Sequence, residues 1–210
     1  RPEREAQVHR RLHGRNNGPL SNGTVSSLIT EIISSCRAQE ELLNIACLGP
    51  AGTFSEEAVL KKFGSQVCIV YCNTIDEVFK SVGSDIAAYG VVPLENSTEG
   101  AISRTLDLLF ESSLSLSGEV GLPVRHNLLS NEKLENIERI YSHSQSLSQC
   151  QKWIGNNFPS AQLIPVASNA TAAKMVVTEE RCAAIASRIA GKHYGLSVVH
   201  SSIEDKPDNT

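Results

Sequence analysis

The chain has 210 residues, which is enough for one large domain or two small ones. Its hydrophobic content of 40%, charged content of 20% and net charge of −4 are typical of a folded soluble protein, and they argue against disorder and against a nucleic-acid partner. No apolar run approaches the ~20 residues that cross a bilayer, and no secretory signal opens the chain, so we expect no membrane partner. The first residue is not Met, and we expect a fragment of a longer protein.

Six cysteines occur without a Cys-x-x-Cys pair and without a histidine at metal-ligand spacing. Most of them lie inside apolar runs, for example at residues 67–72, so we expect buried free thiols. Such thiols persist in a reducing compartment, which predicts a cytoplasmic protein. We predict neither a metal ion nor a cofactor.

The first 43 residues differ from the rest of the chain. Residues 1–11 are dense in charge, and residues 13–19 break the pattern. From residue 24 to residue 43, apolar side chains recur at three- and four-residue spacing, which predicts a long amphipathic helix whose apolar stripe needs a partner. This segment is too short to bury a core of its own, so we expect it to be the end of an all-helical unit.

From residue 44 the pattern changes to short apolar runs that alternate with amphipathic ones. Strands are expected at residues 45–48, 67–72 and 87–94, each followed by a helix. Strands that are separated by helices of this length predict parallel β-α-β crossovers.

Two helix starts carry capping signals in this part of the chain. The glycine loop at 49–55 ends in Ser55, which we expect to cap a helix that stops at Gly64. Thr74, with Glu77 three residues later, predicts a capping box for the next helix.

Residues 114–129 lack a helix signal and are expected to be extended chain that crosses to a second lobe. In that lobe the alternation of strands and helices resumes. We therefore expect an α/β fold of two α/β lobes with a cleft between them, preceded by an α-helical segment. The first lobe is expected to comprise about 44–120 plus 197–210, and the second about 121–196. The strands are expected at 139–141, 162–167, 182–186 and 197–200, and the helices at 147–158, 172–177 and 188–194.

Four expected strand-to-helix junctions are rich in hydroxyls and amides. Such groups beside a helix N-terminus can hold an anion, although plain helix capping is the alternative at each junction. None of the four contains Arg or Lys, so the pattern favours a small anion held by neutral donors over a polyphosphate. The junctions are residues 49–55, 95–100, 142–146 and 168–171.

One side chain at these junctions could serve in acid–base chemistry, and a second was considered as a nucleophile. His143 can exchange a proton near neutral pH, although a turn histidine that bonds to backbone is the alternative. Ser97 has no evident His–Asp set around it, so nucleophilic catalysis is not supported.

The ordered motifs resemble those of the prephenate dehydratase family over essentially all of residues 44–210. Residues 1–43 resemble the C-terminal part of a helical chorismate mutase domain, particularly at 1–5 and 31–36. The whole chain thus resembles the bacterial bifunctional chorismate mutase/prephenate dehydratases, which make phenylpyruvate for phenylalanine synthesis. The motifs are residues 49–55, 90–100, 141–150, 168–173 and 203–205.

The resemblance implies a fold like that of type II periplasmic binding proteins and a lyase that converts prephenate to phenylpyruvate without a cofactor. Glu95 or His143 would supply the proton that the departing hydroxyl needs. The implied substrate-binding residues are Thr53, Ser55, Asn96, Ser97, Thr98, Gln145, Ser168, Asn169, Thr171 and Asn209.

The chain departs from the family pattern at both ends. The family motif reads Asn-x-Thr-Arg-Phe, so Asn209 fits its Asn, Thr210 fits the intervening position, and the essential Thr would be the next residue. Of the mutase site, only Glu3, Arg4 and Glu40 fall at matching positions. The regulatory ACT domain of the family is not among these residues. We therefore expect the chain, as given, to be impaired in both activities.

Two alternative functions remain open from the sequence. One is an arogenate dehydratase, and the other is a two-lobed module that binds a small anion without turnover. The partners implied are prephenate, chorismate in the full protein, and further copies of the chain in a homodimer or larger homo-oligomer.

Overall fold

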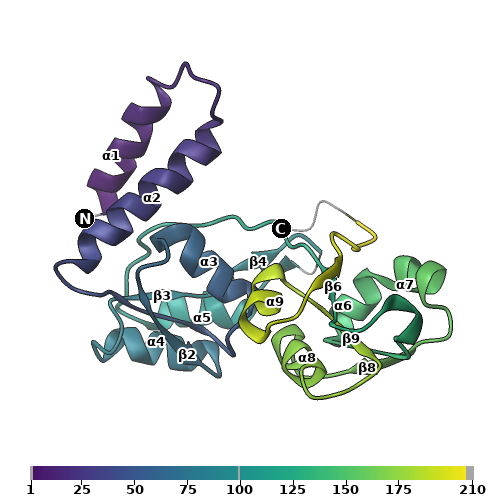
Figure 1. The fold of residues 1–210 in the computed structure, drawn as a ribbon. Coiled ribbons are helices and arrows are strands. Elements are labelled where there is room, and N and C mark those ends of the chain that lie inside the picture. Colours follow the sequence, from purple (N-terminus) through teal and green to yellow (C-terminus); the bar gives the residue numbers. More distant parts are fainter. Residues whose placement is uncertain (1, 99, 207–210) are drawn as a thin grey trace.

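The computed structural model describes residues 2–98 and 100–206. An N-terminal helical hairpin projects from an α/β body that contains two main sheets (Figure 1), and Glu31 and Ser34 of its second helix accept hydrogen bonds from Ser65 and Gln66 of that body. Helix α1 (Pro2–His13) packs against α2 (Asn22–Ala38), and an ion pair between Glu5 and Arg37 joins them. The long amphipathic helix is confirmed, although it ends at Ala38 and not at residue 43.

The first sheet has three parallel strands in the order β2-β1-β3, as the β-α-β pattern predicted. Successive residues of a strand face opposite sides of the sheet. Ile45 and Cys47 of β1 therefore pack with Val59 of α3, whereas Ala46 packs with Val78 of α4. The elements are β1 (Asn44–Leu48), α3 (Phe54–Phe63), β2 (Cys68–Cys72), α4 (Ile75–Gly83), β3 (Tyr89–Val91) and α5 (Ser103–Glu111).

The capping residues of this lobe are as predicted, with one difference. Thr53, and not Ser55, is the N-cap of α3, because Thr53 has an extended backbone and its side chain accepts from the backbone N–H of Glu56. Thr74 caps α4 as predicted, and Gly64 ends α3 in a conformation with φ +82°. Ser55 lies in the first turn of α3.

The expected junction at residues 95–100 has a different structure. After β3, the chain forms a small antiparallel arm from β4 (Glu95–Asn96) and β5 (Gly100–Ala101), and α5 begins only afterwards. The hydroxyl of Thr105 donates to the carbonyl of Pro93 at 2.7 Å, which fixes the base of the arm. The helix expected after Gly100 is present and begins at Ser103, but the polar residues 95–98 lie in the arm and not at the N-terminus of that helix.

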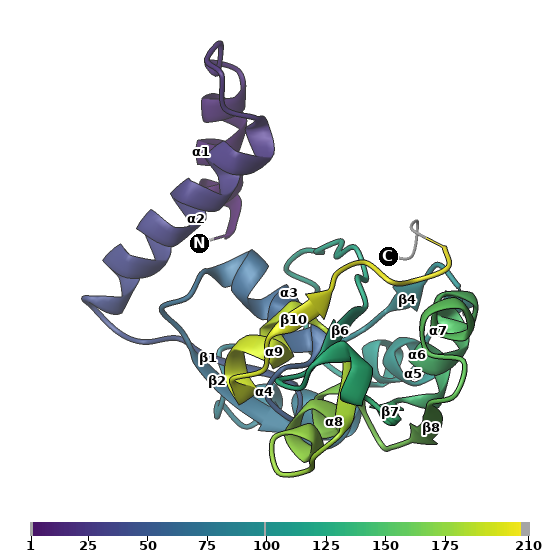
Figure 2. The same cartoon turned by 45° about the vertical axis from the view of Figure 1, so that its right-hand side comes forward.

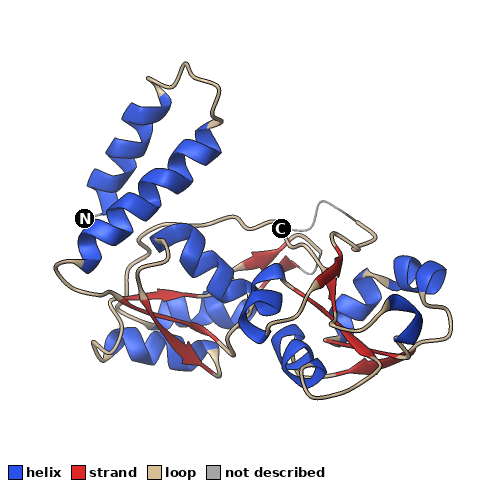
Figure 3. Cartoon of the chain, in the orientation of Figure 1, coloured by secondary structure: helices blue, strands red, loops and turns tan. Residues whose placement is uncertain are grey.

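The second sheet has five strands in the order β10-β6-β9-β7-β8, with helices on both faces (Figure 3). Strands β8, β7 and β9 are parallel, whereas β6 and β10 run antiparallel to their neighbours. All five residues of β9 are buried. The elements are β6 (Asn127–Leu129), the 3₁₀ helix η1 (Leu134–Asn136), β7 (Arg139–Ser142), α6 (Ser144–Gln149), α7 (Gln151–Asn157), β8 (Gln162–Pro165), α8 (Asn169–Val176), β9 (Cys182–Ala186), α9 (Arg188–Tyr194) and β10 (Val198–His200).

The described part of residues 197–210 belongs to the second lobe, contrary to the expected assignment to the first. Strand β10 pairs with the open edge of β6, and Ile203 is buried in the same core cluster as Leu128 and Ile140. The side chain of Asp205 accepts from the backbone of α7. An apolar residue and a free strand edge thus hold this segment where it lies.

The two lobes meet where the glycine loop of residues 49–55 touches α9, which lies between the sheets in both views (Figures 1 and 2). Gly52 has φ +90°, and a Cβ on it would lie 2.9 Å from the Cα of Ala190. Ser187 donates to the carbonyl of Gly52 at 2.8 Å, and Tyr194 donates to that of Ala51 at 3.1 Å. Two lobes are confirmed, and the cleft between them stays a prediction.

Replacing Gly52 with alanine is expected to lower the free energy of unfolding by about 2–4 kcal/mol, because the left-handed backbone and the contact with Ala190 both oppose a methyl group. Gly155→Ala is the matched control, since an added Cβ in α7 meets nothing within 4 Å. That change is expected to stabilise by about 0.5–1 kcal/mol. Urea unfolding measures both variants, and equal midpoints would contradict the close approach.

Candidate functional site

The glycine loop is organised by a carboxylate that the sequence reasoning missed. The side chain of Glu56 is only 3% exposed. Its Oε2 accepts from the backbone N–H of Gly52 at 2.6 Å, and its Oε1 lies 2.6 Å from Nε2 of His193 on α9. Glu56 reads in the sequence as an ordinary acidic residue of a first helical turn. Only the packing of α3 against α9 turns it into a buried link between the lobes.

Thr53, a predicted binding residue, already has two protein partners. Its Oγ1 donates to the carbonyl of Leu48 at 2.9 Å and accepts from the backbone N–H of Glu56 at 3.4 Å. Ser55 is half-buried one residue into α3. The hydroxyl of Thr53 therefore shapes the loop, and Ser55 is the better candidate for contact with a ligand.

The junctions at 142–146 and 168–171 are brought together by one amide. Oδ1 of Asn169 accepts from the Ser142 hydroxyl at 2.8 Å and from the backbone N–H of His143 at 3.0 Å. Its Nδ2 donates to Oγ of Ser146 at 2.8 Å. These bonds use both acceptor positions and one of the two N–H groups of the amide. Asn169 thus fixes two predicted junctions as one unit.

Several of the other predicted site residues take part in helix capping. The Ser168 hydroxyl accepts from the backbone N–H of Thr171 at 3.0 Å and lies 2.8 Å from the Thr171 hydroxyl. Nδ1 of His143 accepts from the backbone N–H of Gln145 at 3.4 Å, so His143 is the N-cap of α6. His143, Gln145, Ser168 and Thr171 are all half-buried. They therefore keep partly accessible side chains at the two joined junctions.

The β4–β5 arm carries the remaining candidates of the first lobe. Glu95, Ser97 and Thr98 are exposed, and Asn96 is half-buried. Oδ1 of Asn96 accepts from the backbone N–H of Thr98 at 2.9 Å, which makes a local turn between the two short strands. The arm thus presents polar side chains from a separate element, and not from the start of α5.

The closing segment is anchored by two acidic side chains. Glu204, with a side chain only 3% exposed, accepts from Nη1 of Arg125 at 3.0 Å and from the backbone N–H of His126 at 2.9 Å. The Asp205 carboxylate accepts from the backbone N–H groups of Lys152 and Trp153. The two predicted positions that follow, Asn209 and Thr210, lie outside the described residues.

The three residues that match the mutase site lie on the helical hairpin or directly after it. Glu3 and Arg4 are exposed on α1, and Glu40 is exposed two residues beyond the end of α2. Their role stays a prediction.

The cysteines were also considered as nucleophiles or metal ligands. The six cysteines are free, and four of them are buried. Burial raises the pKa of the Cys47 and Cys150 thiols to about 12, and nearby acidic groups add to this effect, so neither forms a nucleophilic thiolate at neutral pH. Within residues 2–98 and 100–206, no group of three His, Cys, Asp or Glu could hold a metal ion.

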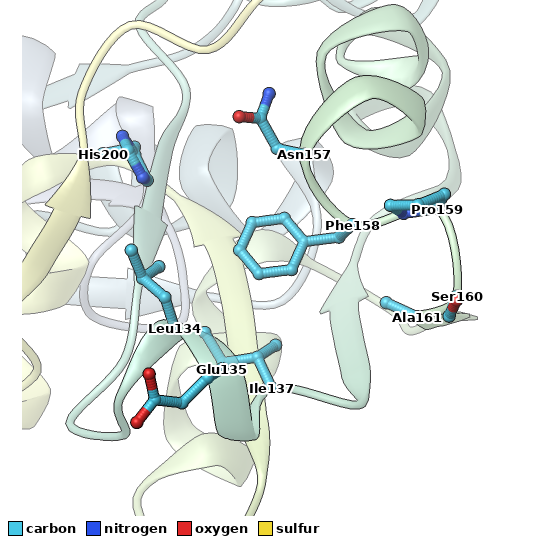
Figure 4. Close-up of a pocket in the computed structure, with 9 residues that line it drawn as sticks. All are labelled: Leu134, Glu135, Ile137, Asn157, Phe158, Pro159, Ser160, Ala161 and His200. Atoms are coloured by element: carbon cyan, nitrogen blue, oxygen red, sulfur yellow. The ribbon is translucent and has the colours of Figure 1, made fainter.

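A cavity of about 410 Å³ lies at the outer side of the second lobe, around Phe158 and His200 (Figure 4). None of the predicted site residues lines it. The cavity is therefore separate from the candidate site at the junctions.

Comparisons with known proteins match this geometry to one family. A family model described as prephenate dehydratase matches residues 45–210. The chain is 50% identical over 212 residues to the bifunctional chorismate mutase/prephenate dehydratase of Pseudomonas aeruginosa, an alignment that covers 100% of this chain and 58% of that protein. It is 38% identical over 167 residues to the prephenate dehydratase of Methanocaldococcus jannaschii, covering 76% of this chain and 59% of that protein.

Among solved structures, the chain resembles a prephenate dehydratase in complex with L-Phe from Arthrobacter aurescens, with a TM-score of 0.70 and 28% identity. That likeness covers 79% of this chain and 57% of the other. The chain thus spans less than two thirds of the length of these relatives. The family model nevertheless matches the two α/β lobes and leaves the helical hairpin outside it. The chain belongs to the prephenate dehydratase family.

Proposed function

We propose that this chain carries the dehydratase site of a protein that converts prephenate to phenylpyruvate in L-phenylalanine biosynthesis. Residues 44–210 form the dehydratase part, and residues 1–43 are the end of a chorismate mutase domain that makes prephenate from chorismate. The observation that carries the proposal is the set of neutral donors that Asn169 joins at the junctions 142–146 and 168–171. Membership of the family supports it.

The reaction explains why neutral donors suit this site. The bond between the ring carbon and the carboxylate breaks, its electrons form a ring double bond, and the hydroxyl leaves with one added proton as water. The carboxylate leaves as carbon dioxide, and the ring with its pyruvyl group remains as phenylpyruvate. A cation that clamped the departing carboxylate would stabilise the ground state and slow the reaction. Hydroxyls and amides can instead orient the pyruvyl carboxylate, which stays on the product.

The substrate contacts that we propose come from both lobes. Ser55 and the arm residues 96–98 lie on the first lobe, and Gln145, Ser168 and Thr171 lie on the second. Thr53 and Asn169 hold these groups in place through their own hydrogen bonds. The Thr that would follow Thr210 is proposed to hydrogen-bond the departing hydroxyl, with Asn209 beside it.

A turnover assay tests this function. The chain as given and the chain extended by Thr-Arg-Phe are each incubated with prephenate, and phenylpyruvate is followed by its absorbance. We expect turnover by the extended chain and at least about 10²-fold less by the shorter one, because the Thr that assists the leaving group is missing. No product from the extended chain would refute the enzyme and favour a binding module. Faster turnover of arogenate would identify that substrate instead.

Glu95 is our candidate for the proton donor. Nδ1 of His143 accepts from the backbone N–H of Gln145 and so serves as the cap of α6. Glu95, by contrast, is exposed on the β4–β5 arm and caps no helix.

In the extended chain, Glu95→Gln is therefore expected to lower kcat by about 10²-fold or more. His143→Gln is the matched control and is expected to change kcat by less than about tenfold. Steady-state kinetics with prephenate measure both variants. Near-normal kcat in Glu95→Gln would remove this residue from the role, and the reverse ranking would assign the role to His143.

Asn169→Ala tests the role of the amide that joins the two junctions. The change removes three hydrogen bonds and leaves Ser142 and Ser146 with fewer partners, so we expect the free energy of unfolding to fall by about 1–3 kcal/mol. KM for prephenate is expected to rise because the donors lose their alignment. Asn157→Ala, which removes one exposed bond to the carbonyl of Trp153, is expected to stay within about 0.5 kcal/mol of the parent. Equal changes in the free energy of unfolding and in KM for the two variants would contradict the proposal that Asn169 joins the two junctions.

We propose that copies of the chain associate through the helical hairpin. Leu28 and Ile32 lie one turn apart on α2 and are 54% and 57% exposed, so the apolar stripe has room for a partner. No helix among the described residues is long and apolar enough to cross a membrane. The free buried cysteines support a place in the cytoplasm.

A further inference from the structure

One buried histidine lies among three segments that the proposed function uses. His126 precedes β6 and is 2% exposed. Its ring meets the ring of Phe54 edge-on, with the centroids 5.8 Å apart, and Phe54 directly follows the glycine loop's Thr53. The other two segments are the end of α6 at Gln149 and the closing segment at Ile203 and Glu204.

Both the side chain and the backbone of His126 are bonded to these segments. Nε2 of the ring lies 2.8 Å from Oε1 of Gln149. The backbone N–H donates to Oε2 of Glu204 at 2.9 Å, and the backbone carbonyl accepts from the N–H of Ile203 at 2.9 Å. The carbonyl of Gln149 in turn accepts from the N–H of Asp205 at 2.8 Å. His126 and Gln149 therefore hold the closing segment from two sides.

Packing alone does not account for a histidine at this position. Burial lowers the pKa of His126, although the bond to Gln149 and the charge of Glu204 act in the opposite direction, so the ring is neutral at pH 7. With Gln149 Oε1 as acceptor, the proton is on Nε2, and the buried Nδ1 has no hydrogen-bond partner among the residues that the structure describes. A phenyl ring would pack against Phe54 without that cost.

We propose that His126 is a positioning residue for the reaction: its Nε2–H group bonds to Oε1 of Gln149, and this bond keeps in place the two backbone carbonyls, of His126 and Gln149, that accept from Ile203 and Asp205 of the closing segment. This inference rests on the proposed function, because the closing segment leads to Asn209, Thr210 and the expected Thr. The placement of residues 203–205 sets where that part of the chain starts. If residues 203–205 are displaced, turnover would fall while binding through the glycine loop, the arm and the two joined junctions is kept.

Two substitutions of His126 separate this role from packing. His126→Phe keeps a ring against Phe54 and removes the N–H, whereas His126→Gln places an amide N–H near the position of Nε2. In the chain extended by Thr-Arg-Phe, we expect His126→Phe to lower kcat by about tenfold or more, with KM within about threefold of the parent. We expect His126→Gln to keep most of kcat. His200→Phe on the sheet edge is the matched control and is expected to keep the kcat of the parent.

A double-mutant cycle with Gln149→Leu tests whether His126 acts through Gln149. If it does, His126→Phe lowers kcat much less in the Gln149→Leu background than in the parent. Parental kcat in His126→Phe would overturn the inference. Equal losses of kcat in His126→Phe and His126→Gln that parallel a loss of stability would also overturn it. Losses of kcat that are fully additive with that of Gln149→Leu would overturn it as well.

Hydrogen exchange gives a readout that does not depend on turnover, so a failure of the proposed function can be told from a failure of this inference. In the chain as given, the amides of Ile203 and Asp205 are bonded to His126 and Gln149. We expect both amides to exchange at least about tenfold faster in His126→Phe than in His126→Gln, with the core amides of β9 unchanged. Equal exchange in the two variants would overturn the inference even if the extended chain proves inactive.

Discussion

The contact between the glycine loop and α9 is the constraint on which the arrangement of the lobes depends. Gly52 comes so close to Ala190 that no side chain fits between them, and Glu56 reaches across to His193 while it also holds the backbone of Gly52. A buried carboxylate is tolerated when it is paired and hydrogen-bonded. Because these bonds cross from the first lobe to the second, they fix the glycine loop against α9.

The second lobe supplies a rigid frame for the rest of the candidate site. Asn169 ties the start of α6 to the start of α8, and the fully buried β9 lies beneath both. The closing segment rests on the same lobe through Ile203, Glu204 and Asp205. Gln145, Ser168, Asn169 and Thr171 thus lie at two helix starts that Asn169 joins. This arrangement suits a reaction in which donors must keep their geometry while charge moves through the substrate.

Much of the fold could be predicted from local patterns. The strands and helices of both lobes follow apolar periodicity, and the caps at Thr74 and Gly64 follow known residue preferences. The errors arose where the pairing of strands decides the outcome. The β4–β5 arm depends on an antiparallel pairing across a few residues, and β10 depends on the free edge of β6. A single sequence gives no sign of which strand edge is free.

The sequence by itself determined the alternation of strands and helices, the neutral polar junctions and the resemblance to a dehydratase family, because these depend on residue type and spacing. Only the tertiary structure decided which polar groups are already bonded, since a hydrogen bond between distant segments leaves no local pattern. Glu56 and His126 looked ordinary in sequence, yet each is buried and joins segments far apart in the chain. The tertiary structure thus distinguished the groups that build the site, such as Asn169, from those that remain accessible to a ligand.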